Sequence, residues 1–369
     1  MTELMQASRQ WASRPADQRH TSLDELVAHT TKKKETSVAR VISSRQIEVR
    51  PVEEDEQRKS LAVIGPDDAP SLPTHWSFGQ LASRVKAPAG YLRNLPADVA
   101  ADCLNWGLQQ KGIDEIGCLL RNDQENPIEL AAATGPNYGR VYNADVARAL
   151  RERFGDGVTG QFTVPGEFGQ ELESVTKRNT TIYSSDRDMF VFLADEKNTI
   201  EIPNRRHGQS GEMSRGFFVW NSEVGSQSLG IATFLFDYVC CNRIVWGAQG
   251  YEEIRVRHTA GAPDRWVEEV APAIEAYANK STDSITLAIE NARKNRIGDE
   301  DAVQEFLRKR FTKGQAKAIA MAHVADEDRP IENLWDATVA ATAYARGVKY
   351  QDDRIGLERK AGKIMALAS

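Results

Sequence analysis

The sequence is poor in cysteine and has no long apolar run. Its 369 residues include four cysteines, Cys103, Cys118, Cys240 and Cys241, and no two of them are spaced as C-x-x-C. Disulfide frameworks and structural zinc sites need more cysteine at regular spacing. No stretch approaches the ~20 apolar residues of a membrane-spanning helix, and residues 1–14 lack the apolar segment of a signal peptide. We therefore expect a soluble, cytoplasmic protein with reduced thiols and no membrane partner.

Recognisable catalytic patterns are also missing from the sequence. It contains no P-loop, no Rossmann glycine pattern and no nucleophile elbow. None of its six histidines pairs with another histidine or a cysteine at metal-ligand spacing. The sequence thus predicts no enzyme activity, no metal and no cofactor. The alternative is a metal-dependent nuclease that uses the carboxylates of Asp186, Asp188 and Glu223.

The composition is that of a folded protein with an acidic balance. Apolar residues make up 41% of the chain, charged residues make up 27%, and the formal net charge is −6. These fractions are typical of globular domains. An acidic net charge does not suggest a nucleic-acid-binding protein, but such binding depends on how charge is distributed over the surface.

The order of strand-like and helix-like patterns along the sequence predicts an α+β fold with three regions. We expect residues 1–35 to form a flexible N-terminal arm with a short helix at Leu23–His29. Residues 36–262 should form an α+β body with a mixed, largely antiparallel sheet and helices. Residues 263–369 should form a helical C-terminal region. The clearest strands are rich in aromatic and β-branched residues and lie at Val38–Ile42, Met189–Leu193, Gly216–Trp220 and Leu229–Phe236.

Several helices are indicated by caps and by helical spacing. Val99, Cys103 and Trp106 recur at helical spacing, and Asn143–Phe154 is a second helix. Asp299 is a helix cap, and Thr312 with Gln315 predicts a capping box. The helices over residues 299–324 are alternatively a helix-turn-helix, although Gly314 falls inside the second of them.

One stretch, Arg215 to Gly261, carries a specific set of motifs. It contains Asn-Ser-Glu-Val-Gly at 221–225, Val-Cys-x-Asn at 239–242 and Arg-His-Thr at 257–259. Together with the upstream Trp76–Leu81, these motifs resemble the domain-of-unknown-function family 932, also described as phage/plasmid-like proteins. The resemblance covers roughly residues 75–350. It implies a protein of a mobile element but no particular activity.

The motif Asn221-Ser222-Glu223-Val224-Gly225 is predicted to be a turn between two strands. Asn and Ser side chains can bond the nearby backbone in such a turn, and Gly225 accepts a positive φ. Our interpretation is a hairpin followed by a buried strand. The alternative is a functional loop.

Three groups of basic residues are candidates for contact with nucleic acid. Arg255 and Arg257 share one face of a strand at period two. The other two groups are a loop that we expect to be mobile and a basic stretch of the helical region: Arg205 and Arg206 in the loop, and Arg308, Lys309, Arg310 and Lys313 in the stretch. Phe217, Phe218, Trp220 and Trp246 could add base stacking to backbone charge, the two terms of single-strand binding. The alternative for each group is an ordinary solvated surface.

From these features we expect a nucleic-acid-binding accessory protein of a phage or plasmid. Its role would be single-strand DNA binding or annealing in recombination. We also expect a homo-oligomer, because such a sheet leaves an edge to be covered. The alternative is a non-enzymatic regulatory or counter-defence protein that binds a host protein or a small ligand.

Overall fold

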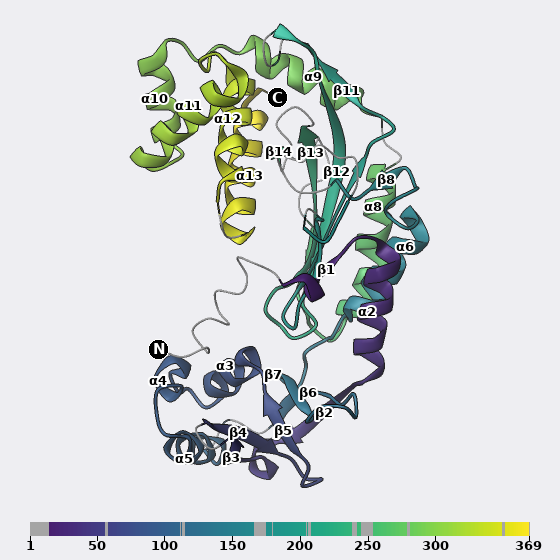
Figure 1. The fold of residues 1–369 in the computed structure, drawn as a ribbon, viewed down its shortest axis with the longest axis vertical. Coiled ribbons are helices and arrows are strands. Elements are labelled where there is room, and N and C mark those ends of the chain that lie inside the picture. The colour runs from purple at the N-terminus through teal and green to yellow at the C-terminus, as the bar shows by residue number, and fades with distance from the viewer. Residues whose placement is uncertain are drawn as a thin grey trace.

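The chain folds into two sheets and a group of helices arranged along one axis (Figure 1). The computed structural model describes residues 15–55, 58–110, 112, 115–165, 175–178, 180–203, 205, 208–237, 242–244, 254–278, 281–348 and 351–368. A small unit lies at one end, a large sheet in the middle and a helical cap at the other end. Both sheets are mostly antiparallel and the C-terminal region is helical, which confirms the predicted α+β class.

The small unit is a six-stranded sheet with helices on one face. Its strand order is β2-β6-β7-β5-β4-β3, and only β5 and β7 pair in parallel among its described strands. The strands are β2 (Ser37–Ser43), β3 (Glu48–Asp55), β4 (Arg58–Ile64), β5 (Pro70–Pro73), β6 (Glu115–Arg121) and β7 (Glu129–Thr134). The helices are α3 (His75–Arg84), α4 (Ala89–Leu92) and α5 (Ala97–Leu108). Helix α5 buries Ala101, Leu104 and Leu108, so the helix was predicted correctly, but Trp106 on the predicted stripe is 71% exposed.

The large sheet has nine strands and is covered by helices on one face. Its main order is β1-β9-β10-β12-β13-β14, and every strand pair described in it is antiparallel. The strands are β1 (Arg19–His20), β8 (Phe162–Thr163), β9 (Ile182–Ser184), β10 (Met189–Asp195), β11 (Ile200–Ile202), β12 (Gly211–Asn221), β13 (Leu229–Asp237), β14 (Asn242–Ile244) and β15 (Ile254–Val256).

The central strands of this sheet are buried on both faces. Because side chains alternate along a strand, Val191, Phe217 and Val219 point to one face and Phe218 and Trp220 to the other. The first face packs against the following helices: α2 (Leu23–Glu35), α6 (Asn143–Phe154), α7 (Ala262–Arg265) and α8 (Ala271–Ala278), with a π-helical segment (Trp266–Val270) between the last two. This double burial explains why β10, β12 and β13 read as continuous apolar runs in the sequence.

The N-terminal stretch is more ordered than we expected. Helix α2 starts at the cap Ser22, runs to Glu35 and buries Leu23 and Leu26 completely. It packs against α6, while β1 pairs with β9. The predicted helix at Leu23–His29 is confirmed and continues to Glu35. Residues 19–35 do not form a flexible arm, however, because burial and strand pairing hold them in place. Residues 1–14 lie outside the described part of the chain.

The helical cap begins at α9, because α7 and α8 belong to the layer on the large sheet. The cap contains α9 (Asp283–Lys294), α10 (Glu300–Arg308), α11 (Lys313–Glu327), α12 (Leu334–Arg346) and α13 (Gln351–Met365). The cap at Asp299 and the capping box of Thr312 and Gln315 are confirmed. No helix in the described ranges is both long and apolar enough to cross a membrane.

Candidate functional site

The turn Asn221–Gly225, called the signature turn below, is buried at the junction of the two sheets. It connects β12 to β13, which confirms the predicted hairpin. The Asn221 amide donates to the carbonyl of Val141 and to Oδ1 of Asn143, both at 2.8 Å. The Glu223 carboxylate accepts from Arg121 at 2.7 Å and from the N–H of Asn143 at 3.0 Å. A turn with this many internal partners has a structural role.

The signature turn also binds the first helix of the small unit. Trp76 Nε1 and Gln80 Nε2 both donate to the Val224 carbonyl, at 3.2 and 2.8 Å. Gly225 has a φ of 84°, and a Cβ there would lie 3.3 Å from Nε2 of Gln80 and 3.4 Å from the Tyr138 ring. The backbone conformation therefore favours glycine at this position, and the tight approach of the Gln80 side chain leaves little room for a Cβ.

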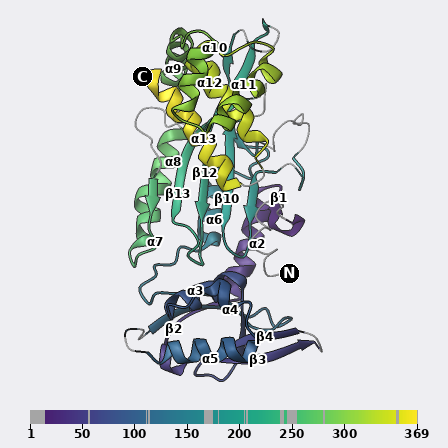
Figure 2. The same cartoon turned by 90° about the vertical axis from the view of Figure 1, so that its left-hand side faces the viewer.

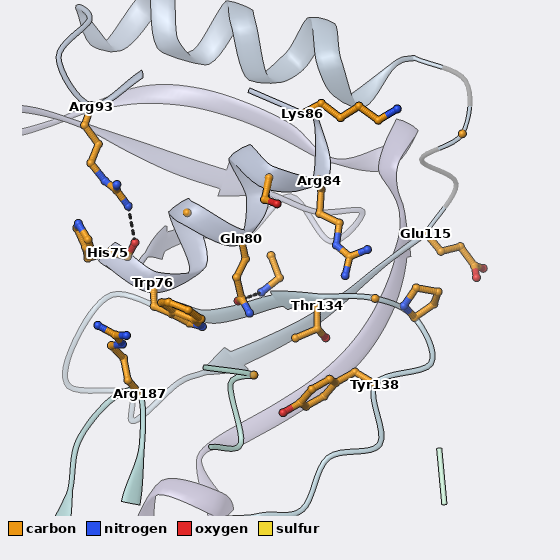
Figure 3. A pocket seen from close by; sticks show the side chains of 17 residues that line it. His75, Trp76, Gln80, Arg84, Lys86, Arg93, Glu115, Thr134, Tyr138 and Arg187 are labelled. Atoms are coloured by element: carbon orange, nitrogen blue, oxygen red, sulfur yellow. Dashed lines mark hydrogen bonds between the residues drawn. The ribbon is translucent and has the colours of Figure 1, made fainter. Parts of the chain in front are cut away.

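A third contact connects the signature turn to the β9–β10 hairpin. The hydroxyls of Ser222 and Ser226 donate to the carbonyl of Arg187 at 2.5 and 3.1 Å. Because the same turn holds Trp76 and Arg187, the two side chains meet, with the guanidinium 4.5 Å from the indole centre (Figure 3). The turn thus assembles a site from segments that lie more than a hundred residues apart.

These contacts border a cavity of about 1210 Å³ between the small unit and the large sheet, called the cleft below. It is lined by His75, Trp76, Gly79, Gln80, Ser83, Arg84, Lys86, Arg93, Gly112, Glu115, Ala133, Thr134, Gly135, Pro136, Tyr138, Arg187 and Gly225. Among these described residues, four side chains are permanent cations, and the only carboxylate, that of Glu115, points away from Arg84 in Figure 3.

The four cations of the cleft, Arg84, Lys86, Arg93 and Arg187, have no carboxylate partner. None of them forms an ion pair within the part of the chain that the structure describes. Arg93 donates to the carbonyl of His75 at 2.8 Å, and the Arg84 guanidinium lies against Gly135, where a Cβ would be 3.1 Å away. The Nε groups of Arg93 and Arg187 are buried donors with no acceptor among the described residues. Such groups favour an anionic ligand.

Burial and the excess of positive charge lower the pKa values of basic side chains in the cleft. Burial lowers the pKa of His75, and the nearby guanidiniums of Arg93 and Arg187 lower it further. Burial also lowers the pKa of Arg93. Tyr138 is fixed in place, because its hydroxyl donates to the Ser222 carbonyl at 2.8 Å and its ring stacks on His258. The free cleft therefore presents positive charge beside two aromatic rings.

The structure contradicts the prediction for Arg205. Its side chain is only 1% exposed and pairs with Asp237 at 2.7 Å and with Glu327. Burial alone would lower the pKa of Arg205, but attraction to Asp237 and the hydrogen bond with Glu327 raise it above its usual value. Arg205 belongs to the core beneath the cap, not to a mobile loop. Arg206 lies outside the described residues.

The other predicted cations do not line the cleft, and all of them are exposed except Arg310, which is half-buried. Arg255 lies in β15, 5.7 Å from the Trp220 ring, and Arg257 follows the same strand. The basic group of the cap lies at the opposite end of the molecule from α3 (Figure 1). It is formed by Arg308, Lys309, Arg310 and Lys313. Its Lys309 pairs with Glu305 at 2.8 Å, and its Arg310 lies over the Phe306 ring.

The predicted aromatic stacking surface is wrong. Phe217 and Phe218 are fully buried, on opposite faces of the sheet, and Trp220 is 3% exposed. Trp246 lies outside the described residues. Double burial of the sheet is the reason, because it leaves these rings no free face. The half-buried Trp76 and Tyr138 take their place in the cleft.

The three carboxylates of the nuclease alternative do not converge. Asp188 accepts from the Ser185 hydroxyl at 2.9 Å, Glu223 pairs with Arg121, and Asp186 is exposed. No cluster of His, Cys, Asp and Glu that could hold a metal ion occurs in the described ranges.

Sequence reasoning missed the cleft cations because they are scattered along the chain. Arg84 is the last residue of α3 and Lys86 follows it, Arg93 caps the end of α4, and Arg187 lies in a hairpin flanked by two acidic residues. No run of charge marks them. The one available signal was the motif beginning at Trp76, which supplies an aromatic ring and an amide to the cleft.

One family model matches the chain, and it is described as Domain of unknown function (DUF932). The match covers residues 170–360, just over half of the chain. No curated protein and no solved structure matches it. The matched range contains Arg187 and the signature turn but not α3 or β7. The cleft is therefore built partly from the family's region and partly from the small unit that precedes it.

Proposed function

The chain belongs to the family described as Domain of unknown function (DUF932), and from that premise we propose that it binds single-stranded nucleic acid in the cleft. The observation that supports this function is the convergence of Arg84, Lys86, Arg93 and Arg187, without carboxylate partners, around half-buried Trp76. Single-strand binding requires cations for the backbone and aromatic faces for the bases. Both are present here in one cavity.

The size and shape of the cleft favour a flexible polymer over a small molecule or a DNA duplex. Its volume of about 1210 Å³ exceeds the roughly 300–1,000 Å³ of sites for small molecules. Proteins that read duplex DNA insert a helix or a ribbon into a groove. Here the cations line a concave cleft. A flexible single strand can enter such a cleft and place its bases and phosphates inside it, whereas a rigid duplex cannot.

The wider role that we infer is that of a mobile-element accessory protein in the host cytoplasm, acting in single-strand binding or annealing during recombination. A homo-oligomer is part of this proposal. Strand β2 is an edge of the small sheet, and its Val38 and Val41 are 48% and 53% exposed. An open edge with exposed apolar residues is a surface that a second copy can cover.

The test is fluorescence anisotropy with a labelled oligothymidylate at low salt, with a duplex of the same length for comparison. The double variant Arg93→Gln/Arg187→Gln should bind about 10- to 100-fold more weakly, because charge-assisted hydrogen bonds are lost. The slope of log affinity against log salt should fall by about 1.4, at about 0.7 per phosphate contact on a single strand.

The matched control is Lys313→Gln/Lys317→Gln, which removes two exposed cations far from the cleft. This control should bind like the wild type. If the wild type does not bind the single strand at low salt, the proposed function is wrong. If the cleft variant and the control bind equally, the strand does not occupy the cleft.

A further inference from the structure

A smaller pocket of about 260 Å³ lies beside the cleft, on the aromatic face of the large sheet. We call it the turn pocket. Its polar lining includes Ser226, Gln227, Ser228, Arg255 and Arg359. Gly225 lines the cleft and Ser226, the next residue, lines the turn pocket, so one segment separates the two cavities. Residues 225–228 can span at most about 11 Å.

The sheet positions Arg255 through a row of residues across three strands. Trp220 of β12 lies opposite Gly230 of β13, which lies opposite Arg255 of β15. A Cβ on Gly230 would be 2.1 Å from the Trp220 ring, so the indole lies flat across this glycine toward Arg255. The Arg255 guanidinium is then 5.7 Å from the ring centre. Glycine at position 230 is what allows this arrangement.

A second guanidinium reaches the same ring from the helical cap. Arg359 of α13 lies 5.6 Å from the centre of the Trp220 ring. Two guanidiniums beside the Ser228 hydroxyl can bind a phosphate group. The Ser226 hydroxyl already donates to the Arg187 carbonyl, and the Gln227 amide lies 3.5 Å from Asp188. Trp220 is itself 3% exposed, so it positions the two arginines and leaves no face for a stacked base. The turn pocket therefore suits a phosphate group, not a nucleobase.

We propose that the turn pocket binds a backbone phosphate of the same strand whose neighbouring nucleotides occupy the cleft. This inference rests on the proposed function and specifies the path of the strand across residues 225–228. Figure 2 shows α3 of the cleft and α13 of the turn pocket on the same side of the molecule. A strand that leaves the cleft on this side meets Arg255 and Arg359 next.

The test compares two lengths of oligothymidylate: about three nucleotides, which the cleft alone can hold, and about twenty nucleotides, which exceed the range of a single binding module. The double variant Arg255→Gln/Arg359→Gln should bind the short strand like the wild type and the long strand about tenfold more weakly. Its salt slope on the long strand should fall by about 1.4, because two phosphate contacts are removed. The cleft variant Arg93→Gln/Arg187→Gln should lose affinity for both lengths.

Two controls separate a lost contact from a damaged fold. Arg257→Gln removes an exposed cation from the same segment, lines neither cavity and should bind both lengths normally. Arg255→Lys/Arg359→Lys keeps the charge and should restore most of the salt slope. If Arg255→Gln/Arg359→Gln keeps the wild-type salt slope on the long strand while the cleft variant loses binding, the turn pocket does not bind a phosphate. The proposed single-strand binding in the cleft then still stands. If the wild type binds neither strand, both proposals fail.

Discussion

The arginines beneath the helical cap and those of the cleft have opposite surroundings. Beneath the cap, Arg205 lies between Asp237 and Glu327, and within the large sheet Arg215 likewise pairs with Asp195 at 3.1 Å. Arg93 and Arg187, in contrast, have no carboxylate partner in the described chain and are partly buried. The same residue type therefore serves two purposes. A neutralised guanidinium stabilises the fold, while one without a carboxylate partner is available to a ligand.

The physical reason is the high free energy of a charge that is removed from water without a partner. Under the cap, Asp237 and Glu327 offset this cost, and the pair connects α11 to β13. In the cleft the cost is only partly offset by the His75 carbonyl and the Trp76 ring. A bound phosphate would supply the missing negative charge.

The largest effect should follow from breaking the buried group beneath the cap. Arg205→Ala leaves Asp237 and Glu327 buried without their cation, and breaking such a pair costs about 3–5 kcal/mol. Denaturant unfolding should show this loss, while the folded fraction binds the single strand normally. Arg296→Ala is the control, because its pair with Glu332 is exposed. A loss below that of the control would show that Arg205 does not hold the cap to the sheet.

A smaller effect should appear in the pH dependence of binding. The pKa of His75 is lowered by burial and by Arg93 and Arg187, and only Asp186 opposes them. A bound phosphate should raise this pKa, so binding takes up a proton and affinity should increase as pH falls from about 8 to about 6. The gain is about tenfold for each unit by which binding raises the pKa.

An NMR titration of His75 with and without the strand measures this coupling directly. His75→Gln should remove the pH dependence and leave the affinity at pH 8 nearly unchanged. An unchanged pKa of His75 in the complex would place the strand outside the cleft.

The smallest effect should come from the basic group at the end of α10. Lys309 is 67% exposed and its partner Glu305 is 71% exposed, so their ion pair contributes little to stability. The variant Arg308→Gln/Lys309→Gln should change stability by less than about 0.5 kcal/mol. Its affinity for the single strand should stay within about twofold of the wild type, as an anisotropy titration would show. A large loss would move the binding surface from the cleft to the cap.

Much of the fold was predictable because its signals are local. The run Asn143–Phe154 gave a helix with the observed bounds, and Asp299 and Thr312 cap their helices as predicted. Their richness in aromatic and β-branched residues located β10, β12 and β13. The signature turn was recognised as a hairpin from Asn221 and Gly225. Each of these depends on spacing and caps within about a dozen residues.

The sequence by itself determined the elements, the family and the position of the signature turn. Only the tertiary structure decided which cations are neutralised and which line a cavity. Arg205 found partners 32 and 122 residues away, and Arg187 met Trp76 across the junction of the two sheets. Electrostatic pairing depends on the distance between two charges in the folded protein. That distance cannot be read from the sequence when the two residues belong to segments that are far apart along the chain.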